Sequence, residues 1–81
     1  MKMALFSEFV DLAKKHRMHP LYLHNILRFR ILGVGNSEIA TLIGVNRNTV
    51  NRYVNIMSKI PVEEALRLAE LVCFTERLDV K

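Results

Sequence analysis

The chain has 81 residues, of which 51% are apolar and 25% are charged, with a formal net charge of +4. A chain of this length is one small domain, residues 1–81, and its single cysteine excludes a disulfide-stapled scaffold. No apolar run approaches the roughly 18 residues that a helix spanning a bilayer needs, which excludes a membrane protein of that kind.

The pattern of apolar residues predicts an all-α fold, a compact bundle of about five short helices. A first amphipathic helix is predicted from its N-cap at Ser7 to about His16. Pro20 suits the first turn of a second helix, which reaches about Leu32, where two glycines end it.

The next two predicted helices follow each other closely. Residues 36–44 form a short helix that ends at Gly44, a residue suited to the left-handed conformation past a helix end. Only Val45 separates it from Asn46, a good N-cap for a fourth helix at about 46–58. Two helices joined by so short a turn cross steeply, and Ala40 is the small residue expected where they touch.

The fourth predicted helix carries an unusual polar face. At about 100° per residue, five of its side chains fall within roughly 140° of one another. They are Arg47, Asn48, Asn51, Arg52 and Asn55. Asn is a poor helix former, so three in one helix cost about 1 to 2 kcal/mol relative to Ala. Asn with adenine and Arg with guanine are the pairings that major-groove geometry favours.

These two helices resemble a known motif. The motif is the helix-turn-helix of bacterial and phage DNA-binding proteins. The residues that resemble it are Glu38-Ile39-Ala40, Gly44-Val45, Arg47, Thr49-Val50 and Arg52-Tyr53. On the flanks, residues 60–71 resemble the lambda repressor/Cro class, and residues 32–40 are similar to LuxR-type domains. The resemblance implies a cytoplasmic, nucleoid-associated protein of a prokaryote or virus that binds double-stranded DNA with its fourth helix in the major groove.

The candidate DNA-binding residues come from the polar face and from this resemblance. The candidate base readers are Asn46, Arg47, Asn48, Asn51, Arg52 and Asn55. The candidate phosphate contacts, which position a protein without specifying sequence, are Thr49, Arg28, Arg30 and Lys59.

The distribution of charge agrees with this interpretation. Residues 14–59 contain eight basic residues against one acidic residue, Glu38, and both ends of the chain are net acidic. A basic centre between acidic ends is typical of a chain that presents its middle to phosphates. The alternative is that these are ordinary solvated faces, which is the better account of Lys14, Lys15 and Arg17 taken alone.

A fifth helix is predicted from Pro61 to about Thr75, with two apolar stripes. The stripe expected to cover the domain contains Val62, Ala65, Leu66, Ala69, Val72 and Cys73. The other contains Leu68, Leu71 and Leu78, and it is the predicted dimerisation surface within residues 60–78. The alternatives are a fully internal helix and a site for a different partner.

No enzyme chemistry is expected. There is no nucleophile–base pair, no carboxylate pair and no cofactor fingerprint. His16, His19 and His24 lack the partners of a metal site, so neither a metal nor a cofactor is predicted.

The sequence favours a homodimeric transcription regulator, and two other functions remain open. One is an accessory factor of recombination, transposition or plasmid partition. The other is an adaptor that binds a protein such as RNA polymerase through its last helix.

Overall fold

The computed structural model describes residues 2–76, which form five α-helices. The helices are α1 (Lys2–Lys15), α2 (Pro20–Ile31), α3 (Asn36–Ile43), α4 (Arg47–Lys59) and α5 (Val62–Glu76). The described residues contain no strand, and the prediction of a small all-α bundle is confirmed.

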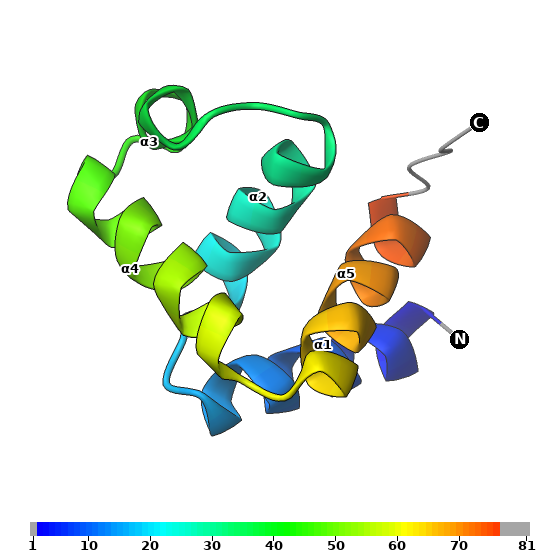
Figure 1. Ribbon diagram of the computed structural model, residues 1–81. Helices are drawn as coiled ribbons and strands as arrows, with labels where there is room; N and C mark the ends of the chain where they lie inside the picture. Colours follow the sequence, from blue (N-terminus) through cyan, green and yellow to red (C-terminus); the bar gives the residue numbers. More distant parts are fainter. Residues whose placement is uncertain (1, 77–81) are drawn as a thin grey trace.

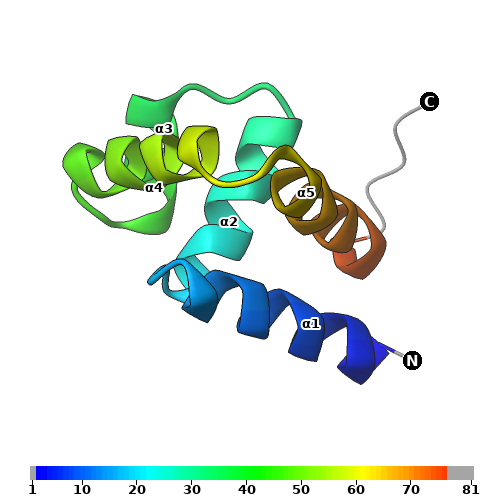
Figure 2. The same ribbon diagram turned by 60° about the horizontal axis from the view of Figure 1, so that its bottom comes forward.

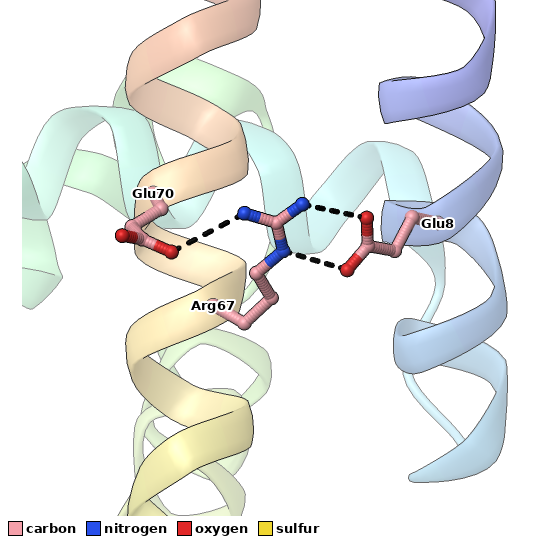
Figure 3. A network of polar contacts seen from close by, with 3 residues as sticks. All are labelled: Glu8, Arg67 and Glu70. Atoms are coloured by element: carbon pink, nitrogen blue, oxygen red, sulfur yellow. Dashed lines mark hydrogen bonds and ion pairs between the residues drawn. The ribbon is translucent and has the colours of Figure 1, made fainter.

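The helices divide the molecule into two ends. α3 and α4 occupy one end, and the N-terminus of α1 and the C-terminus of α5 lie at the other (Figures 1 and 2). α2 runs between them and packs on all four other helices. α1 and α5 lie side by side and run in opposite directions (Figure 3). The pair of helices predicted to bind DNA therefore projects from a three-helix base.

The first residues of α1 and α2 can be compared with their predicted starts. α1 starts at Lys2, so the prediction that Ser7 is its N-cap is wrong. Residues 2–6 contain no Gly or Pro, and nothing stops the helix from extending upstream of a serine. α2 starts where predicted, with Pro20 in its first turn and the imidazole Nδ1 of His19 accepting a hydrogen bond from the Leu21 amide.

All five helices contribute to a single hydrophobic core. Its buried members are Phe9, Ala13, Met18, Leu23, Ile26, Leu27, Ile39, Ala40, Val50, Tyr53, Leu68, Leu71 and Val72. None of these core side chains is charged, so the core is stabilised by apolar burial and close packing.

Of the two predicted stripes of α5, the one expected to face outward is buried, whereas the one expected to face inward is divided, with Val72 buried and Val62 and Leu66 exposed. Leu68 and Leu71 are both 0% exposed within the single chain, so the prediction that they form a dimerisation surface is wrong. Leu68 and Leu71 are three apart, so they point to one side of α5, and α5 packs on α1 and α2. Leu66, assigned to the inner stripe, is instead 62% exposed. Leu78 lies outside the described residues.

Ion pairs reinforce the packing of α1 on α5. The Arg67 guanidinium donates to both carboxylate oxygens of Glu8, at 2.6 and 2.8 Å, and to Glu70 at 3.3 Å (Figure 3). One turn of α5 earlier, Glu64 accepts from Lys15 and contacts the imidazole Nε2 of His16 at 2.6 Å. The hydrogen bond from Arg67 lowers the pKa of Glu8, and those from Lys15 and His16 lower the pKa of Glu64.

The burial of the inner stripe predicts which leucines of α5 stabilise the fold. Leu71→Ala leaves a cavity in the core and should lower the free energy of unfolding by about 2 to 5 kcal/mol, measured by urea denaturation. Leu66→Ala is the matched control on the outer side of the same helix and should change it by no more than about 0.5 kcal/mol. Equal losses would contradict the orientation of α5.

The two lowered carboxylate pKa values predict acid destabilisation. A folded-state pKa below the ordinary value of 4.5 contributes stability that is present above that value and is lost as the pH falls through the folded-state pKa. Unfolding free energy should therefore decrease below about pH 4.5, and Glu8→Gln with Glu64→Gln should make that decrease shallower. Glu63→Gln, an exposed neighbour with no ion pair among the described side chains, should leave the decrease as in the wild type.

Candidate nucleic-acid interface

The turn between α3 and α4 consists of Gly44, Val45 and Asn46. Gly44 adopts φ 75°, a left-handed conformation that residues with a Cβ rarely adopt, and its amide donates to the Ala40 carbonyl at 2.9 Å. The Val45 amide donates to the same carbonyl at 3.0 Å. Ala40 is buried at the crossing, as its small size predicted, and the two axes cross steeply (Figure 1).

The next residue starts the helix that carries the polar face. Asn46 is the N-cap of α4, and its side-chain oxygen accepts a hydrogen bond from the Asn48 amide at 2.8 Å. That oxygen therefore serves the helix end, although Asn46 was predicted to read a base. The structure assigns Asn46 first of all to capping.

The inner side of α4 fixes its position on the domain. Val50 and Tyr53 are buried in the core, as their spacing predicted. The Tyr53 hydroxyl accepts a hydrogen bond of 2.8 Å from the His19 amide, which anchors α4 to the connection between α1 and α2. A helix held on one side by apolar packing and a hydrogen bond presents its other side in a defined orientation.

The outer side of α4 holds the predicted polar face. Its five members, Arg47, Asn48, Asn51, Arg52 and Asn55, are all exposed. Arg52 lies with its guanidinium carbon 5.7 Å from the centroid of the Tyr53 ring. Lys59 is exposed in the last turn of the same helix, and at 100° per residue it falls within the arc of the face. The face thus carries three cations and three amides on one helix.

The other predicted phosphate contacts, Thr49, Arg28 and Arg30, lie in different places on the domain. Thr49 is half-buried at the edge of the polar face. Arg28 and Arg30 are two residues apart on α2, so their side chains leave the helix about 200° apart. Arg30 reaches α3, whereas Arg28 is half-buried with its guanidinium 4.7 Å from the centroid of the Phe29 ring. Through Asn36, Arg30 is linked to Asn51 on the polar face.

One residue that contacts the polar face, Asn36, was not predicted from the sequence. Arg30 Nη1 donates to Asn36 Oδ1 at 2.6 Å, and Asn36 Nδ2 donates to Asn51 Oδ1 at 3.1 Å. Asn36 stands fifteen positions before Asn51, and only the crossing of α3 and α4 brings the two together. Gly35 is the N-cap of α3 and Asn36 is its first residue, so the Asn36 side chain is not used in capping the helix.

The three histidines have structural contacts. His16 pairs with Glu64, and His19 caps α2. His24 Nε2 lies 2.9 Å from the Thr75 hydroxyl, and its ring meets the Phe9 ring edge-on at 5.4 Å. Within the described side chains, no three His, Cys, Asp or Glu residues gather as metal ligands would.

No protein-family model, curated protein or solved structure matches the chain. Among residues 2–76, no helix has the length and apolar character required to cross a membrane.

Proposed function

We propose that this protein binds double-stranded DNA sequence-specifically by inserting α4 into the major groove, and that it acts as a transcription regulator. The observation that supports the proposal is the polar face of α4. An isolated helix gains little from three Asn residues, and their amides are exposed rather than used in the core. Arg and Asn side chains on a projecting helix match the donors and acceptors on the base edges of the major groove.

The charges around this face favour an anionic partner. The segment from residue 14 to residue 59 carries eight basic residues and one acidic residue, and it contains all of α2, α3 and α4. Several described carboxylates outside it are paired with cations on α1 and α5, as for Glu8, Glu64 and Glu70. α4 itself carries Arg47, Arg52 and Lys59 and no carboxylate, so the polar face is positively charged and attracts phosphates.

Selection of bound sequences from random DNA duplexes tests the proposal directly. A recovered consensus supports sequence-specific binding, and an inverted repeat within it supports a homodimer, because one copy carries one such helix. Recovery of no enriched sequence contradicts the proposal. Genomic sites at promoters support a regulator, and sites at recombination ends support an accessory factor of recombination, transposition or partition.

A protein-binding adaptor is the second candidate, and the outer side of α5 favours it. Val62, Leu66 and Phe74 are 70%, 62% and 56% exposed. Exposed apolar side chains on one helix are typical of a contact with another protein, such as RNA polymerase or a second copy of this chain. An adaptor without DNA affinity is distinguished from the first candidate by the same selection experiment.

The central position of Arg52 on the polar face predicts a specific loss. Arg52→Ala should weaken binding to the selected site by about 1 to 3 kcal/mol and relax the base preference at one position, measured by fluorescence anisotropy on variant duplexes. Arg67→Ala removes the same charge from α5 and should have little effect on DNA affinity, with its folding checked by circular dichroism. Equal losses in the two variants would show that the reading face is wrongly assigned.

The cations of α4 also predict the dependence on salt. The logarithm of affinity should fall with the logarithm of salt concentration at a slope of roughly −0.9 for each phosphate neutralised, and about four to six contacts are expected for each copy. Lys59→Ala should reduce the magnitude of that slope by about one contact and weaken all sequences equally. Binding that does not change between low and high salt contradicts an electrostatic interface.

A further inference from the structure

Asn51 lies in a chain of hydrogen bonds whose direction is fixed at its first member. The Arg30 guanidinium has donors only, so the atom of the Asn36 amide that lies 2.6 Å from it must be the oxygen. The Asn36 NH2 group then faces Asn51, and the atom of Asn51 at 3.1 Å must be an acceptor, its Oδ1. The reverse orientation of either amide would set two donors against each other.

This order decides what Asn51 offers to a ligand. Among the described side chains, only Asn36 forms a hydrogen bond with the Asn51 amide, and it uses one of the two lone pairs of the oxygen. The Asn51 Nδ2 group takes part in no hydrogen bond among the described side chains. Asn51 is exposed, and its two N–H donors are therefore the part left for a partner.

The base edges of the major groove differ in how well they match two donors. Guanine presents two acceptors, N7 and O6, whereas adenine presents the acceptor N7 beside the donor N6. The adenine pairing expected for an Asn requires the amide oxygen to accept from N6, and here the hydrogen bond from Asn36 uses one lone pair of that oxygen and directs it toward α3. An Asn51 held in this orientation matches guanine better than adenine.

We propose that Asn36, held by Arg30, is a positioning residue that sets the base preference of Asn51 and turns it from adenine toward guanine. This inference rests on the proposed DNA binding by α4. It adds a specificity-determining residue on α3, outside the helix that enters the groove.

The test exchanges the direction of the hydrogen bonds without removing them. In Asn36→Asp the carboxylate has acceptors only, so it still receives the Arg30 donor but now also requires a donor from Asn51. The Asn51 amide then turns over, and its oxygen faces the groove. Duplex selection with the wild type and with Asn51→Ala first identifies the position that Asn51 reads, as the one whose preference disappears.

At that position the wild type should prefer guanine over adenine by about tenfold, and Asn36→Asp should shift the preference toward adenine by a similar factor. Ser37→Asp is the matched control, because it adds the same charge to the next residue of α3 and has no contact with Asn51. It should weaken binding without changing the preferred base. Asn36→Ala, which adds no charge, should bring the affinities for guanine and adenine close together.

Three outcomes are decisive. No enriched duplex with the wild type overturns the proposed function and this inference with it. Enrichment with an adenine preference in the wild type overturns the inference alone, and so does an unchanged preference in both Asn36 variants. A shift in Asn36→Asp that persists when Asn51 is also replaced by Ala shows that Asn36 acts by another route and likewise overturns it.

Discussion

The left-handed turn at Gly44 is the constraint on which the rest of the candidate interface depends. With φ at 75°, the chain leaves α3 and enters α4 through Gly44, Val45 and Asn46 alone. So short a connection forces the two helices to touch, and Ala40 permits it because its side chain is a single methyl group. The angle of α4, the exposure of its polar side and the approach of Asn36 to Asn51 all follow from that turn.

The base of the domain holds this pair in place. Val50 and Tyr53 bury the inner side of α4, and the hydrogen bond from the His19 amide to Tyr53 joins α4 to the start of α2. α5 contributes the buried side chains of Leu68 and Leu71 to the core. The ion pair between Arg67 and Glu8 joins α5 to α1. A small domain of this size gains most of its stability from such burial, whereas the polar face of α4 stays exposed.

Apolar and polar residues are distributed differently on α4 and α5. This explains why the buried side of α4 was predicted correctly and the buried side of α5 was not. On α4 the apolar and polar residues separate cleanly, so the buried side was evident from spacing. α5 has apolar residues over most of its circumference, and spacing alone gave two acceptable inner sides. In the folded chain Leu68, Leu71 and Val72 are fully buried, whereas Val62 and Leu66 are exposed.

The sequence by itself determined the number of helices, the limits of four of them, the turn at Gly44 and the polar face. Local periodicity, capping and glycine conformation depend on neighbours in the chain. It did not determine that α1 begins at Lys2, since no residue there stops a helix. The side of α5 that faces inward and the contact of Arg30 with Asn36 and Asn51 were decided only by the tertiary structure. Both depend on which helices meet in space, and residues far apart in the chain carry no local signal of that meeting.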